Sequence, residues 1–201
     1  MLPNRISAKL FVDDATTLDP AAFIPLFHSW IREARAPGIP IDVVNYSHVQ
    51  DGPSVLLIGH AGDYIVDFSG GRAGLRYLHK RDWPSATLAG RLQTTLEGLL
   101  LGARLVENDF AAGAAEQPVF HSGELELTFP DRLNTPNRAQ TFNAIQADVG
   151  ELLASFFGVG PLQLLRATDD ERVVLTIAVQ APAAHALAAL QGDLTTAAPV
   201  V

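Results

Sequence analysis

The chain has 201 residues, of which 48% are hydrophobic and only 18% are charged, so it can bury a core and is not a disordered chain. Its net charge of −8 argues against nucleic-acid binding, and the lack of cysteine excludes disulfides and cysteine-ligated metals. No apolar stretch reaches the ~18 residues of a membrane helix, and the first residues lack a signal-peptide pattern. We expect a soluble cytoplasmic protein, one domain over residues 1–201, with no membrane or nucleic-acid partner.

The first predicted elements are a strand and a helix. Apolar and polar residues alternate from Ile6 to Asp13, as in a half-buried strand. Asp19 then has the position of a helix N-cap and Pro20 that of the first helical residue. A helix is therefore predicted from Pro20 to about Arg35.

The next segment predicts a hairpin. The turn signal Asp51-Gly52 separates two strands, Ile41–Val49 and Ser54–His60. A two-residue turn there places His48 and His60 on opposite faces of the sheet, about 16 Å apart along the strand. Two histidines in that arrangement cannot share an ion, so no metal site is predicted.

A second hairpin follows directly. Its strands are Asp63–Phe68 and Ala73–Arg81, joined around Gly70-Gly71. Between the two hairpins, Gly59 and Gly62 predict a bulge or bend within one long middle strand.

The clearest amphipathic helix begins at Trp83-Pro84-Ser85. Its apolar residues recur at steps of three and four: Leu88, Leu92, Leu96, Leu99, Ala103 and Val106. The small-residue stretch Asn108–Gln117 then predicts a loop, which would divide the chain into halves 1–109 and 117–192, with a tail over 193–201.

The second half repeats this kind of order. It predicts a strand over Phe120–Phe129 and a helix after Thr135-Pro136 that stops at Gly158. A last hairpin, Leu162–Thr168 with Arg172–Gln180, precedes a short alanine-rich helix at Ala183–Leu190.

The two halves invite comparison as an internal repeat. The stretches KLFVDDATTLDPAAF and ELTFPDRLNTPNRAQTF align, although their spacings differ by about two residues. Two interpretations stay open: two pseudo-symmetric β-α-β-β halves, or a coincidence between two common units. In either case the pattern predicts an α+β fold, a largely antiparallel sheet of about seven to nine strands with three main helices on one face.

The most distinctive segment is IDVVNYSHVQDGPSVLLIGHAGDYIVD. It holds a concentration of polar residues: Tyr46, His48, His60, Asp63, Tyr64 and Asp67. From Leu10 to about Val179 the chain resembles a family of bacterial proteins without assigned function. The resemblance implies no mechanism.

The pairing around Gly70-Gly71 sets Tyr64 opposite Tyr77 and brings a candidate ligand-binding cluster to one face. Its members are His60, Tyr64, Tyr77, His79 and Arg81. Such a patch can bind an anion or position a proton. However, the same face would carry the core-like Leu56 and Ile58. Under the alternative interpretation, the tyrosines therefore pack as a cross-strand pair, with their polar tips at the sheet margin.

No nucleophile–base pair, ligand set or cofactor motif can be assembled from these residues. We therefore expect a non-catalytic small-ligand or protein-binding module without a cofactor, its ligand unknown. The alternative is a small-molecule enzyme that uses the His/Tyr/Arg patch. A histidine of shifted pKa in a concave pocket would favour the enzyme, and a flat exposed apolar face would favour the binding module.

The sparse charge also predicts a homodimer, because extra apolar surface can be covered in a symmetric pair. The strands at the sheet edges and the segment Ala183–Leu190 are the expected contacts, since neither has an obvious cover within the chain.

Overall fold

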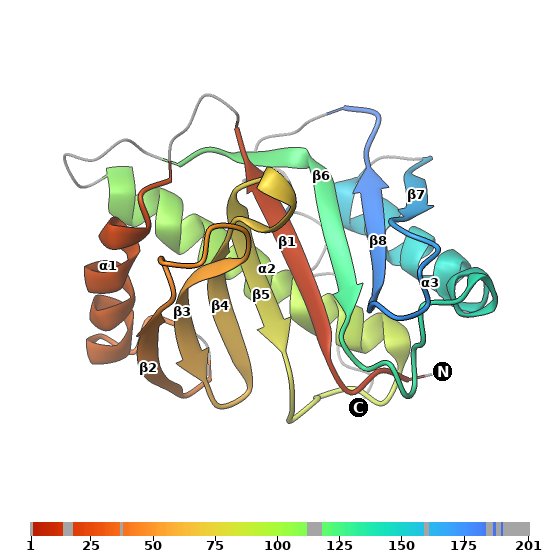
Figure 1. Cartoon of the computed structure of the whole chain (residues 1–201), viewed down its shortest axis with the longest axis horizontal. Coiled ribbons are helices and arrows are strands. Elements are labelled where there is room, and N and C mark those ends of the chain that lie inside the picture. The colour runs from red at the N-terminus through yellow and green to blue at the C-terminus, as the bar shows by residue number, and fades with distance from the viewer. Residues whose placement is uncertain are drawn as a thin grey trace.

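The computed structural model describes residues 2–13, 18–36, 38–111, 118–158 and 161–183, together with Leu187 and Leu190. Over these residues the predicted α+β fold is confirmed: an eight-stranded antiparallel sheet with three helices (Figure 1). The helices are α1 (Pro20–Arg32), α2 (Leu88–Ala111) and α3 (Ala139–Phe157). The strands are β1 (Ile6–Val12), β2 (Pro40–Asn45), β3 (Pro53–Gly59), β4 (Gly62–Asp67), β5 (Gly74–His79), β6 (Phe120–Phe129), β7 (Gln163–Arg166) and β8 (Leu175–Gln180).

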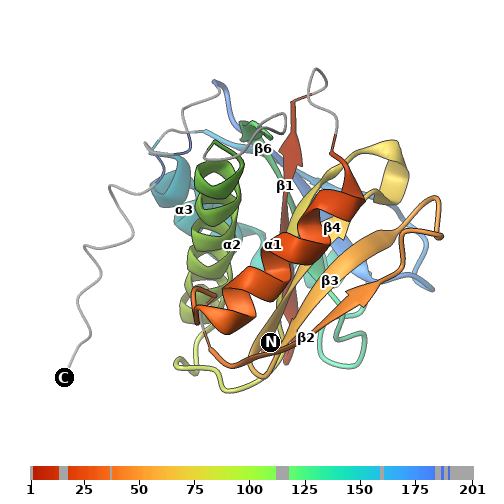
Figure 2. The ribbon, with the colours of Figure 1, turned by 90° about the vertical axis from the view of Figure 1, so that its left-hand side faces the viewer.

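The strands lie in the order β2-β3-β4-β5-β1-β6-β8-β7, so β2 and β7 are the two end strands. All three helices lie on the same side of the sheet, and none covers the opposite face (Figure 2). Among the described helices, none is both long and apolar enough to cross a membrane.

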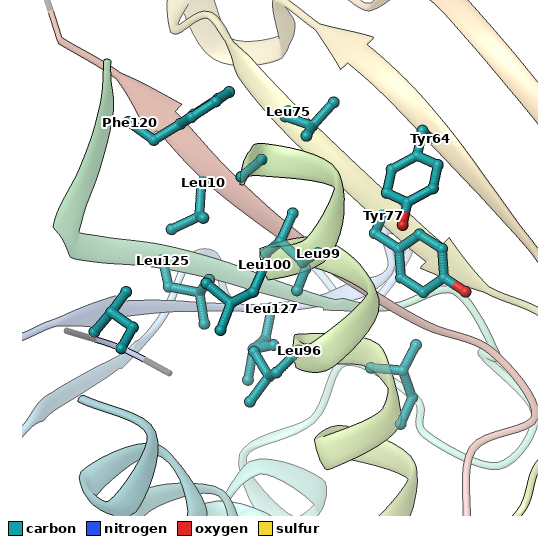
Figure 3. Packing of buried hydrophobic residues seen from close by; sticks show 14 of the residues in the cluster. Leu10, Tyr64, Leu75, Tyr77, Leu96, Leu99, Leu100, Phe120, Leu125 and Leu127 are labelled. Atoms are coloured by element: carbon teal, nitrogen blue, oxygen red, sulfur yellow. The ribbon is translucent and has the colours of Figure 1, made fainter. Parts of the chain in front are cut away.

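Alternation along the strands separates the two faces of the sheet. In β1, Ile6, Ala8 and Leu10 point toward the helices and are buried. The predicted apolar stripe of α2 is buried along its whole length and packs against this face. Leu96, Leu99 and Leu100 meet Leu10, Leu125 and Leu127 in this core (Figure 3). Each such side chain contributes about 1.5–3 kcal/mol to folding.

Helix α1 begins where the sequence predicts. The Asp19 carboxylate accepts a hydrogen bond from the Ala21 backbone N–H at 3.0 Å, and Pro20 is the first helical residue. The helix ends at Arg32, three residues before the expected Arg35.

Helix α2 begins later than predicted, at Leu88 and not at Trp83. Thr87 is the reason, because its hydroxyl accepts a hydrogen bond from the Gly90 backbone N–H at 3.1 Å and caps the helix there. At its other end the helix runs to Ala111, so the predicted loop from Asn108 begins too early. Residues 112–117 of that loop lie outside the described residues.

Helix α3 begins at Ala139 rather than directly after Thr135-Pro136. Pro136 instead forms an isolated antiparallel bridge with Val174. The predicted stop is confirmed: Gly158 follows the helix in a left-handed conformation with φ of 63°.

The β2–β3 pairing corrects the predicted register. A two-residue turn at Asp51-Gly52 would set His48 opposite Val55, but Asn45 lies there, because β2 ends early at Asn45. The Asn45 side chain accepts a hydrogen bond from the Ser47 backbone N–H at 2.9 Å, which turns the chain out of the strand. His48 therefore lies in a loop, and the two-residue turn at Asp51-Gly52 was wrong.

The predicted long middle strand was also wrong. β3 and β4 are antiparallel neighbours joined by a turn at residues 60 and 61. Leu56 pairs with Ile65, which places both on the face opposite Tyr64. By contrast, the predicted β4–β5 register is confirmed, with Tyr64 opposite Tyr77.

The structure does not confirm a repeat of halves 1–109 and 117–192. β8 pairs directly with β6, whereas β4 and β5 separate β1 from the β2–β3 hairpin. Both β-α-β-β units have the relative order first, third and second strand, but only the second unit has its first and third strands side by side, and one hydrophobic core includes residues from both.

The predicted helix Ala183–Leu190 and the tail 193–201 lie mostly outside the described residues. Leu187 and Leu190 are described, and both are buried in the core. These two residues therefore have a cover within the chain, contrary to the expectation for this segment.

Candidate functional site

A cavity of about 300 Å³ lies between α2 and the end of β5. Its described lining residues are Gly38, Ala61, Tyr77, His79, Thr94, Glu97, Gly98 and Leu101. The four from α2 are spaced three, four and seven residues apart, so they form one stripe along the helix. This stripe runs beside the core stripe, which explains why one helix both seals the core and walls the cavity.

Tyr77 and His79 supply the polar part of the wall. They are two residues apart on β5, so both point toward the helices, and both are buried. The Tyr77 hydroxyl and His79 Nδ1 share a hydrogen bond at 3.2 Å. His79 Nε2 is buried and has no hydrogen-bond partner of normal geometry among the described residues.

Trp83 closes the far side of the histidine. Its ring centroid lies 4.2 Å from that of His79. The indole N–H donates to the carbonyl oxygen of Asn4 at 3.0 Å, and the Arg91 guanidinium lies over the ring at 5.0 Å. The imidazole is thus held on one side by Tyr77 and on the other by an anchored indole.

Tyr64 anchors the tyrosine pair to α2. Its hydroxyl donates to the Gly98 carbonyl oxygen at 2.7 Å, and its ring lies 4.8 Å from that of Tyr77 (Figure 3). Gly98 and Gly102 leave space for these rings: a Cβ would lie 2.4 Å from Tyr77 and 2.2 Å from Tyr64, respectively. These two glycines, which interrupt the apolar stripe in the sequence, are therefore contact positions.

Burial keeps the side chains of Tyr77 and His79 neutral near pH 7. It raises the pKa of Tyr77 to about 12, with a smaller contribution from the Asp63 carboxylate. Burial also lowers the pKa of His79, an effect that the nearby backbone of Arg81 and Asp82 only partly opposes. The wall therefore presents an un-ionised phenol and a neutral imidazole.

The structure brings together three of the five predicted cluster residues: Tyr64, Tyr77 and His79. His60 lies in the β3–β4 turn with its side chain 48% exposed, and its Nε2 contacts the Asp82 carboxylate at 3.0 Å. Arg81 follows the end of β5 and is exposed. Neither lines the cavity. The chain turns at residues 60 and 61, where the prediction continued a strand, and β5 ends at His79, before the predicted end at Arg81.

The uncovered face of the sheet carries a buried ionic cluster that sequence reasoning missed. Lys9 and Asp67 are only 1% and 2% exposed, with Nζ and Oδ2 at 3.0 Å. Lys9 also donates to the backbone carbonyl oxygens of Arg72 at 2.7 Å and Ser69 at 3.4 Å. All three of its ammonium hydrogens are thus accounted for.

Arg76 completes the cluster. Its Nε and Nη2 donate to Asp67 at 3.0 and 2.8 Å, and Nη2 also donates to Glu126 at 2.7 Å. Nη1 donates to the hydroxyls of Ser7 and Thr128, both at 3.3 Å. A groove of about 310 Å³ lies over these residues, but the guanidinium hydrogens already have acceptors. We therefore interpret the cluster as structural.

Within the described ranges, no group of three or more His, Asp or Glu side chains could hold a metal ion. The strand pairing predicted for His48 and His60 is absent from the structure, because β2 ends at Asn45 and His48 lies in the following loop.

Comparison with known proteins gives no further guide. No family model, curated protein or solved structure matches this chain. The resemblance to an uncharacterised bacterial family stays a prediction.

Proposed function

We propose that the protein is a non-catalytic binding module for a small ligand, and that the ligand occupies the cavity beside Tyr77 and His79. The composition of the cavity wall supports this proposal. Apolar surface from Ala61, Leu101 and the Tyr77 ring surrounds a few polar groups in fixed positions. Small-molecule sites have this character, and their volumes begin at about 300 Å³.

The bonding of the polar groups favours binding over catalysis. The Thr94 hydroxyl donates to the Gly90 carbonyl oxygen at 2.9 Å, so it is not activated by a base. The buried pair Tyr77–His79 uses Nδ1 internally, and Nε2 is covered. Such groups position a ligand without exchanging protons with it.

The alternative, an enzyme that uses the Tyr77–His79 pair, has one observation in its favour. A histidine of lowered pKa beside a cavity is a feature of catalytic sites. Against it stands the Tyr77 pKa of about 12, far from the operating range of a general acid. Of the predicted patch, His60 and Arg81 do not reach the cavity, so an enzyme would have to work without them.

Binding of small ring compounds tests the proposal. Phenol and indole are titrated into labelled protein, and the amide resonances of Ala61, Gly98 and Leu101 are followed by NMR. We expect saturable shifts at these positions. Leu101→Trp should abolish them by filling the cavity, whereas Leu133→Trp, on a loop residue that is 90% exposed, should not. Absence of shifts with both compounds would refute the proposal.

We also propose that the protein acts as a homodimer in the cytoplasm, without a nucleic-acid partner. The end strand β2 supports the dimer, because among the described strands it pairs only with β3, and exposed apolar side chains lie within and beside it. The net charge of −8 weighs against phosphate binding.

A further inference from the structure

We infer that the ligand of the Tyr77–His79 cavity is a small organic cation with an apolar body, such as an aromatic or aliphatic amine. This inference rests on the proposed function and adds the chemical class. Of the described lining residues, Glu97 alone carries a formal charge at neutral pH, and no lysine or arginine is among them. A carboxylic acid or phosphate would therefore find no cationic side chain in the wall.

The free hydrogen-bond acceptors of the cavity wall also favour a cationic ligand. The Thr94 hydroxyl uses its proton on Gly90 and keeps lone pairs to accept with. Glu97 accepts one hydrogen bond, from the Gln93 side-chain amide at 2.9 Å, and its exposed carboxylate has further acceptor sites. An ammonium group supplies the donors that these acceptors can use.

The position of Glu97 fits a ligand with an apolar body and one charged end. Glu97 and Thr94 are three residues apart on α2, so they lie together on the helix surface. Glu97 is exposed, whereas Tyr77 and Gly98 are buried. The apolar body of a ligand would then lie against the buried wall, with its charged end at the solvent-exposed carboxylate.

The size of the cavity limits the body. A volume of about 300 Å³ is at the lower end of the range for small-molecule sites, so a single ring with a short chain is the expected scale. The protein's net charge of −8 also favours the approach of cations over anions.

Three probes of similar shape and different charge test the class: phenethylamine, 2-phenylethanol and phenylacetate. Dissociation constants are measured by NMR from the amide shifts of Ala61, Gly98 and Leu101. We expect phenethylamine to bind about two- to fivefold more tightly than the neutral alcohol, because an ion pair with an exposed carboxylate is weak. Phenylacetate should bind most weakly, and added salt should reduce the difference.

Two variants test whether Glu97 causes the tighter binding of the amine. Glu97→Gln should bring the amine and the alcohol to the same affinity without weakening the alcohol. Glu151→Gln, on the exposed surface of α3, should leave the preference unchanged. If the alcohol or phenylacetate binds as tightly as the amine, the cation assignment is overturned while the small-ligand proposal stands. If none of the three probes shifts these amides, both fail.

Discussion

The Tyr77 ring packs directly against the backbone of Gly98. A Cβ at position 98 would lie 2.4 Å from a ring carbon, closer than real contacts allow. The ring in turn is held by Tyr64 and His79, so it cannot move aside without disturbing both. Glycine is therefore required in the middle of α2, although it is a poor helix former.

Gly98→Ala should lower the free energy of unfolding by about 1–3 kcal/mol, because overpacking against Tyr77 outweighs the better helix propensity of alanine. Thermal or urea unfolding measures the effect. Gly150→Ala in α3 is the matched control: its Cβ would have ordinary contact with Leu164 at 3.5 Å. That variant should be stabilised by about 0.5–1 kcal/mol. If both variants are more stable than the wild-type protein, the Tyr77 ring can move away from position 98 at little cost in free energy.

The ionic cluster on the uncovered face should be sensitive to the loss of one partner. Lys9→Met leaves Arg76 as the cationic partner of the buried Asp67 carboxylate, and we expect a loss of about 3 kcal/mol in unfolding free energy. Arg138→Met, which removes the exposed ion pair with Glu171, should change stability by no more than about 0.5 kcal/mol. Equal effects of the two variants would contradict a buried structural role for Lys9.

Asp67 should remain ionised at pH values where ordinary carboxyl groups are already protonated. Burial alone would raise its pKa, but Arg76, the Ser69 hydroxyl and Lys9 outweigh it and lower the pKa to about 2. Because the folded pKa lies below the unfolded one, this contribution to stability is present above about pH 4 and is lost as the pH falls toward 2. Carboxyl ¹³C titration measures the midpoint directly. A midpoint near about 3.9, the ordinary pKa of an aspartate, would refute the electrostatic assignment.

His79 should make stability depend on pH in the mildly acidic range. Burial lowers its folded pKa, so the unfolded chain binds the proton more readily. The free energy of unfolding should then fall as the pH drops below about 6.5, the ordinary pKa of histidine. His79→Asn should flatten this part of the profile, and His28→Asn, at an exposed position, should not. An unchanged slope in His79→Asn would exclude this histidine as the cause.

The parts of the fold with strong local signals could be predicted from the sequence. The α2 stripe and the Asp19 cap follow from spacing and residue type alone, and the β4–β5 register follows from the alternation around Gly70-Gly71. The β2–β3 register could not be read in this way. Its outcome depends on the Asn45 side chain, which turns the chain several residues before Asp51-Gly52.

The sequence predicts the strand residues of the candidate site but not the helix residues. Tyr64, Tyr77 and His79 are neighbours within one hairpin, so alternation places them together. Thr94 and Glu97 come from a helix whose position over β5 depends on tertiary packing, and no local pattern joins the two segments. The pairing of Lys9 with Asp67 was missed for the same reason, since it crosses from β1 to the end of β4.

We expect the dimer to form through β2, an end strand of the sheet that has β3 as its one neighbour in the described part of the chain. Ile39 and Ile41 beside and within it are 65% and 58% exposed, an arrangement that soluble proteins normally avoid at a sheet edge. Light scattering at micromolar concentration should give twice the monomer mass. Ile41→Lys should return the protein to a monomer, because a lysine on an edge strand opposes pairing. Leu133→Lys, at a more exposed residue outside the strand, should leave the dimer intact. A monomer mass that persists as concentration rises would remove the dimer, and a dimer unaffected by Ile41→Lys would move its interface away from β2.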